Sequence, residues 1–80
     1  MPRVTKVESI GGYTLRVTFA DGVVGDVDLS NELEGPMFEP LREKAFFALA
    51  FVPPDVSTVT WPNGADIAPE HLYSLIRVPA

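Results

Sequence analysis

Apolar and polar residues alternate with a period of two between residues 13 and 29, which predicts β-strands. The first run places Tyr13, Leu15, Val17 and Phe19 on its apolar side, and the second places Val23, Gly25, Val27 and Leu29 there. A short polar segment separates the two runs, so we expect a β-hairpin.

The length of the hairpin connection decides which residues face each other. A two-residue loop would put Asp26 opposite Val17, on the apolar face. A three-residue loop over residues 20–22 pairs Val17 with Gly25 and matches apolar residues along both strands. Such loops need a left-handed residue at their third position, where a glycine stands. We therefore predict the three-residue loop, with Arg16 opposite Asp26 on the other face and Gly25 marking a bulge or a close backbone approach.

A further strand is predicted at residues 3–10, joined to the hairpin through Gly11-Gly12. Its register is open. A two-residue loop sets Glu8 against Leu15, whereas a three-residue loop sets Val7 against Leu15. We favour the second register because it pairs apolar residues.

The middle of the chain loses the alternation. Gly35-Pro36 and Pro40 exclude one continuous helix, because an interior proline removes a hydrogen bond and clashes with the preceding turn. We expect a loop with a short helical turn at residues 41–44. Its predicted anchors are Leu33, Met37, Phe38 and Leu41.

Two short strands and a helix are predicted after this loop. Phe47, Leu49 and Phe51 alternate as one strand, and residues 56–61 form another. The sequence Pro62-Asn63-Gly64 is typical of a type I turn. Pro69 is expected to open a final helix with Glu70 in its first turn. The buried stripe of this helix is predicted to be Leu72, Leu75 and Ile76.

This order of elements indicates an α+β fold. We expect one domain over residues 1–80, built on a small, mainly antiparallel sheet. An N-terminal three-strand meander and later short strands form the sheet, accompanied by a short middle helical turn and a C-terminal helix.

Composition narrows the class of protein. The chain has 80 residues, 46% of them hydrophobic, and no cysteine. The lack of cysteine excludes disulfides, thiolate metal sites and thiol catalysis. The sequence has no signal-peptide pattern and no apolar run long enough for a membrane span, so we expect a cytoplasmic protein without a membrane association. No cofactor is indicated.

Charge gives the clearest functional indication. Eleven acidic and six basic residues leave a net charge of −5, which disfavours direct nucleic-acid binding. The excess is local, because no Lys or Arg stands between Arg16 and Arg42. The acidic residues of that stretch are Asp21, Asp26, Asp28, Glu32, Glu34 and Glu39. A solvated face would explain them, but uncompensated charges on a strand and the following loop favour binding of a basic protein. The predicted contact residues are Asp26, Asp28, Glu32, Glu34 and Glu39.

Catalytic and metal sites are weakly indicated. His71 is the only histidine, and we expect it to be exposed in the first turn of the final helix, so no catalytic residue is assigned. One histidine and no cysteine provide no recognised metal spacing. Asp66 is expected to accept backbone N–H groups of the turn or of the helix start. Trp61 is expected to be buried against the sheet.

The segment WPNGADIAPEHLY at residues 61–73 resembles the bacterial DUF2442 family, together with residues 15–29 and 38–47. The structural motif comprises Gly22, Trp61, Asn63, Gly64, Asp66, Pro69 and Tyr73. The resemblance implies a small α+β domain, found alone or fused to a helix-turn-helix domain. The sequence leaves no room for a helix-turn-helix domain after the segment at residues 61–73, so we expect none here, and a repressor role of such a fusion is not expected of this chain. The resemblance also implies frequent neighbourhood with genes for small DUF4160 proteins, in an arrangement like a toxin and antitoxin pair.

Three hypotheses follow. The leading one is a non-enzymatic interaction domain, an antitoxin-like partner of a small basic protein bound through the acidic face. The second is an acidic nucleic-acid mimic that inhibits a nuclease or CRISPR effector. The third is a homo-oligomeric structural module, such as a homodimer, that buries exposed sheet edges.

Overall fold

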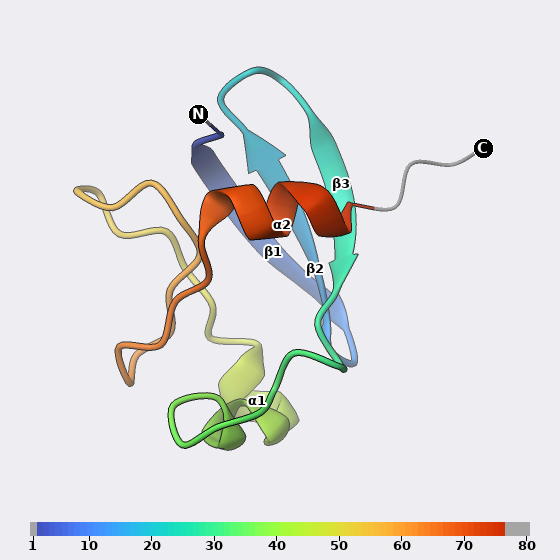
Figure 1. Ribbon diagram of the computed structural model, residues 1–80, viewed down its shortest axis with the longest axis vertical. Coiled ribbons are helices and arrows are strands. Elements are labelled where there is room, and N and C mark those ends of the chain that lie inside the picture. Colours follow the sequence, from blue (N-terminus) through green and yellow to red (C-terminus); the bar gives the residue numbers. More distant parts are fainter. Residues whose placement is uncertain (1, 77–80) are drawn as a thin grey trace.

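The fold is built on a three-stranded antiparallel sheet. The structure is a computed structural model that describes residues 2–76. Its strands are β1 (Val4–Gly11), β2 (Thr14–Phe19) and β3 (Val24–Asp28), in the order β1-β2-β3. The helices are the 3-10 helix η1 (Glu39–Arg42), the short α1 (Lys44–Phe47) and the C-terminal α2 (Pro69–Leu75). Helix α2 lies across one face of the sheet, and α1 lies beyond one end of it (Figure 1). The predicted α+β fold with an N-terminal meander is confirmed.

The β2–β3 hairpin has the predicted register. Leu15 pairs with Val27, and Val17 pairs with Gly25. The N–H of Phe19 donates to the carbonyl of Val23 at 2.8 Å and so closes the three-residue loop. Its third residue, Gly22, has φ of +92°, the left-handed conformation that the loop requires.

Both predicted registers of β1 are wrong. Val7 pairs with Val17, and Ser9 pairs with Leu15. Irregular pairing near each end of the strand shifts the register, between Val4 and Lys6 and again between Ser9 and Gly11. A single uniform register cannot describe a strand with two such shifts, and bulges of this kind leave no reliable trace in the alternation of residues.

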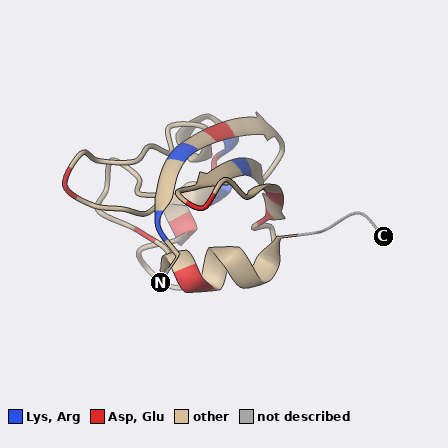
Figure 2. Cartoon of the chain, turned by 90° about the horizontal axis from the view of Figure 1, so that it is seen from above, with Lys and Arg blue, Asp and Glu red and all other residues tan. Residues whose placement is uncertain are grey.

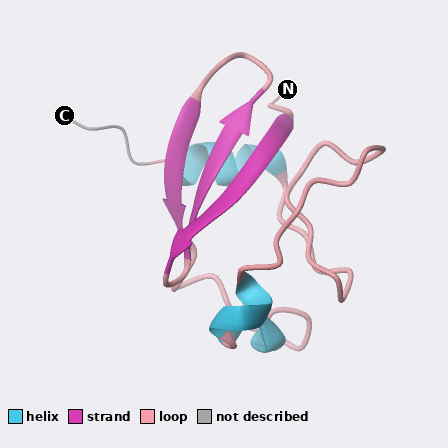
Figure 3. Cartoon of the chain, turned by 180° about the vertical axis from the view of Figure 1, so that it is seen from behind, coloured by secondary structure: helices cyan, strands magenta, loops and turns pink. Residues whose placement is uncertain are grey.

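Helix α2 approaches the sheet closely at Gly25. A Cβ atom added to this glycine would lie 2.3 Å from Cγ2 of Ile76, the residue directly after α2. The glycine therefore serves the close approach that its position suggested. Among residues 2–76, no helix or loop crosses the opposite face of the sheet, which we call the open face (Figure 3).

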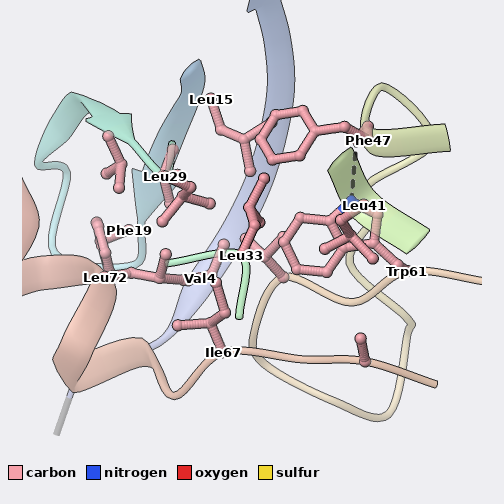
Figure 4. Packing of buried hydrophobic residues seen from close by; sticks show 14 residues of the cluster. Val4, Leu15, Phe19, Leu29, Leu33, Leu41, Phe47, Trp61, Ile67 and Leu72 are labelled. Atoms are coloured by element: carbon pink, nitrogen blue, oxygen red, sulfur yellow. Dashed lines mark hydrogen bonds between the residues drawn. The ribbon is translucent and has the colours of Figure 1, made fainter. Parts of the chain in front are cut away.

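The core lies between the sheet, α2 and the loops near α1. Its largest fully buried side chains are Trp61, Phe19, Phe47, Leu15, Leu29, Leu41 and Leu72. Trp61 is 1% exposed, as predicted, and its Nε1–H donates to the carbonyl of Phe47 at 2.9 Å (Figure 4). Of the predicted loop anchors, Leu33 and Leu41 are buried and Phe38 is half-buried, but Met37 is exposed.

The predicted strand from Phe47 to Phe51 is wrong. Phe47 is the last residue of the short helix α1. Glu43 caps the start of this helix, because its side chain accepts a hydrogen bond from the N–H of Ala45. Phe47 is buried, whereas Leu49 and Phe51 are 53% and 43% exposed, so the three residues share no buried face. A three-residue alternation was too short to distinguish a strand from a helical turn.

Residues 56–61 form no continuous strand. Thr60 makes isolated bridges to Phe51 and Asp66. Prolines 53, 54 and 62 flank this segment and supply no N–H donors, which limits ladder pairing. In place of the predicted later strands, the described residues thus have isolated bridges outside the three-stranded sheet.

The C-terminal part follows the prediction more closely. The N–H of Gly64 donates to the carbonyl of Trp61 at 2.9 Å, which forms the expected turn. Pro69 is the first residue of α2, and Glu70 lies in its first turn. Leu72 is fully buried, while Leu75 and Ile76 are half-buried.

Candidate functional site

Asp26 on β3 forms an ion pair with Arg16 on the neighbouring strand β2. Its carboxylate accepts a hydrogen bond from Nε of Arg16 at 3.0 Å on the open face of the sheet. This contact raises the pKa of Arg16, and the nearby Glu8 raises it further. Both partners of the pair are about half exposed, so the pair is screened by solvent. The expectation of six uncompensated charges is therefore wrong for Asp26.

Asp21 and Asp28 make local contacts that shape the chain. Asp21 accepts a hydrogen bond from the N–H of Val23 within the hairpin loop and another from the hydroxyl of Tyr73 at 3.2 Å. The hydrogen bond from Tyr73 to the Asp21 carboxylate raises the pKa of Tyr73. Asp28 accepts a hydrogen bond from the N–H of Ser30 at 2.9 Å, just after β3.

Glu32 and His71 come together across the fold. Nε2 of His71 lies 2.5 Å from Oε1 of Glu32, which connects α2 to the loop after β3. His71 is exposed and lies in the first turn of α2, as predicted. Sequence reasoning missed its partner, because the two residues are 39 positions apart and belong to different elements.

A recess of about 310 Å³ opens beside this pair. It is lined by Glu32, Phe38, Asp66, Ile67, Ala68 and His71. Ile67 is buried and Phe38 is half-buried, whereas Asp66, Ala68 and His71 are exposed. The recess is therefore lined by the apolar residues Phe38, Ile67 and Ala68 and by two acidic residues, Glu32 and Asp66. We call these six residues the acidic recess.

Asp66 does not cap α2, so that prediction is wrong. The capping position is occupied by Ala68, and no side chain bonds to the start of the helix. Asp66 instead lies in an extended segment bridged to Thr60, two residues before the cap. None of the hydrogen bonds found among residues 2–76 involves the Asp66 carboxylate.

Glu34 and Glu39 are exposed, and neither takes part in the two ion pairs of the described residues. Together with Asp28 and Glu32 they form what we call the acidic strip, which runs from the end of β3 to η1. One basic group lies beside it, since Nε of Arg42 donates to the carbonyl of Leu33 at 2.8 Å. Acidic positions elsewhere are spread over several sides of the chain (Figure 2).

The remaining motif residues have structural roles. Asn63 holds the turn through Oδ1, which accepts from the N–H of Ala65 at 3.1 Å. Its Nδ2 donates to the carbonyl of Met37 at 3.0 Å and joins the turn to the middle loop. Tyr73 packs edge-on against Phe19, with ring centroids 4.8 Å apart. These contacts connect segments that are distant in sequence.

The search for other site types gives two limited findings. Within residues 2–76, no group of three or more His, Asp or Glu residues is arranged to hold a metal ion. Over the same residues, no helix has the length and apolar character needed to cross a membrane.

Comparisons with known proteins point to a family and to one solved fold. Residues 4–78 match the family model described as "Protein of unknown function (DUF2442)". No curated protein matches the chain. The crystal structure named "Putative DNA Binding Protein NE0471 from Nitrosomonas europaea ATCC 19718" is similar, with a TM-score of 0.82 and 26% sequence identity. The similarity covers 95% of this chain but 49% of that protein, so this chain spans about half its length.

Proposed function

The chain belongs to the DUF2442 family, and we propose that it is a non-catalytic interaction domain, an antitoxin-like partner that binds a small basic protein through the acidic strip. The observation that supports the proposal most is the exposure of Glu34 and Glu39 without an ion-pair partner among the described residues. Exposed charges of one sign steer encounter with a partner of the opposite sign.

The geometry favours the loop after β3 over the strand itself. Asp26 already pairs with Arg16, and Asp28 bonds to the backbone of Ser30. Glu34 and Glu39 form no ion pair among the described residues, so they could contact a basic partner without breaking one. Arg42 reduces the local excess of negative charge without removing it.

The test is a titration of the basic protein encoded beside the gene against this domain, by calorimetry at low and at high salt. We expect a complex that weakens as salt rises. The double substitution Glu34→Gln and Glu39→Gln should weaken it by about two- to tenfold, since each exposed ion pair contributes roughly 0.2–1 kcal/mol. Both residues are exposed, so the fold should survive.

The matched control removes two carboxylates elsewhere, with Glu8→Gln on β1 and Asp55→Asn in the later loop. Both residues are exposed, and both double variants have the same net charge. Equal weakening by the two double variants would indicate a general charge effect and contradict a site on the strip. A complex indifferent to salt would contradict the electrostatic mechanism.

Two alternatives give different outcomes. A nucleic-acid mimic would compete with DNA or RNA for one site on its target, whereas an antitoxin-like partner need not. A homodimer would appear in light scattering as a concentration-dependent mass.

DNA binding is a second candidate function, because the similar solved structure carries that description in its name. The net charge of −5 opposes it for this chain. Fluorescence anisotropy with labelled duplex DNA at low salt would test it directly.

A further inference from the structure

The acidic recess has the composition of a subsite for a cationic side chain. No Lys or Arg is among its six residues. The acidic residues Glu32 and Asp66 line it together with the half-buried Phe38 and the buried Ile67. A long cationic side chain suits both kinds of lining residue. Its methylene groups can pack on the apolar residues while its charged end pairs with the acidic ones.

His71 orients one of these carboxylates. Its Nε2 lies 2.5 Å from Oε1 of Glu32, and this is the one side-chain hydrogen bond of Glu32 among the described residues. The carboxylate of Asp66 takes part in no hydrogen bond within residues 2–76. The recess is thus lined by two acidic residues, Glu32 on the loop after β3, which also contacts His71, and Asp66 just before α2.

The chemistry of these groups distinguishes arginine from lysine. A guanidinium is planar, presents several N–H donors in a fixed fork, and can lie against an aromatic ring such as that of Phe38. An ammonium offers a compact charge without that planar match. We propose that the acidic recess binds the guanidinium of an arginine side chain presented by the protein partner. This inference rests on the proposed function and names a contact group within it.

The probe is a capped tripeptide, acetyl-Gly-Arg-Gly-amide, titrated into the ¹⁵N-labelled chain and followed by NMR. We expect saturable shift changes centred on the amides of Phe38, Ile67, Ala68 and His71. Peptides with lysine or with uncharged citrulline in place of arginine should bind more weakly. Equal responses to the arginine and lysine peptides, or a response to citrulline as strong as to arginine, would overturn the proposal.

Variants locate the site. Asp66→Asn should weaken arginine-peptide binding by about two- to fivefold, as expected for one exposed ion pair. Phe38→Leu should weaken it by a similar factor through loss of the ring contact. The matched control Asp55→Asn makes the same charge change at an exposed position outside the recess and should leave binding unchanged. Equal effects of Asp66→Asn and Asp55→Asn would overturn the proposal.

Failure of this inference is distinguishable from failure of the proposed function. If the basic protein binds with the expected dependence on Glu34 and Glu39 but the arginine peptide does not bind at the acidic recess, only the proposal of an arginine subsite is wrong. If the peptide fills the recess but the protein complex is insensitive to salt and to Glu34 and Glu39, only the proposed function is wrong. The fluorescence of the buried Trp61 verifies that each variant is folded.

Discussion

The contact between Gly25 and Ile76 sets the distance between α2 and the sheet, and Gly25→Ala is the perturbation that tests it. The added Cβ would lie 2.3 Å from Cγ2, 3.0 Å from Cγ1 and 3.2 Å from Cβ of Ile76. These atoms belong to the branched base of the side chain, so a rotation of a flexible tip cannot relieve the clash. The end of α2 must therefore move away from β3.

Overpacking of this kind costs roughly 1–3 kcal/mol. In the absence of a clash, replacement of glycine by alanine within a strand would stabilise the folded state by about 0.5–1 kcal/mol. We expect Gly25→Ala to lower the free energy of unfolding by about 0.5–2 kcal/mol, and the melting temperature by about 4–8 °C for each kcal/mol.

The assay is urea unfolding followed by the fluorescence of Trp61, the only tryptophan of the chain and 1% exposed in the fold. A double-mutant cycle with Ile76→Ala isolates the contact. In the Ile76→Ala background, Gly25→Ala should be neutral or stabilising. An equal destabilisation in both backgrounds would refute the assignment of the clash to Ile76.

Three further predictions concern other contacts. Trp61→Phe removes the buried N–H that donates to Phe47 and part of the core volume, so we expect a loss of about 2–4 kcal/mol in urea unfolding followed by circular dichroism; a loss below about 1 kcal/mol would contradict this role. Asn63→Asp keeps the acceptor for the N–H of Ala65 but loses the donor to Met37, which should cost about 0.5–1.5 kcal/mol, less than Asn63→Ala; the reverse order would be inconsistent with the two bonds. Because the pKa of Tyr73 is raised by its hydrogen bond to Asp21, that stabilisation is present below pH 10 and is lost as pH rises through the folded pKa. The difference in stability between the wild type and Tyr73→Phe should therefore close above pH 10, and a difference that persists in strong base would count against the bond.

Features set by local chemistry were predictable from the sequence. The register of the β2–β3 hairpin follows from the glycine at its third loop position and from matching apolar residues, and both survive in the structure. The same holds for the turn after Trp61 and for Pro69 at the start of α2. In each case, a residue with a narrow conformational range decides the local geometry.

Features set by tertiary contacts were not predictable in this way. The two register shifts of β1 depend on how the strand lies against β2, and the alternation of residues does not record them. The contact between Glu32 and His71 joins residues from a loop and a helix, and neither neighbourhood signals the other. The acidic recess was missed for the same reason, although Glu32, Asp66 and His71 were each singled out as individual residues.

Hydrogen exchange of the complex with the basic protein partner tests the central claim most directly. Binding through the acidic strip and recess should slow amide exchange within residues 28–39 and 66–71. The open face of the sheet, including β1, should exchange as in the free domain. Protection confined to β1 or to residues 51–58, with no change in residues 28–39, would contradict the account.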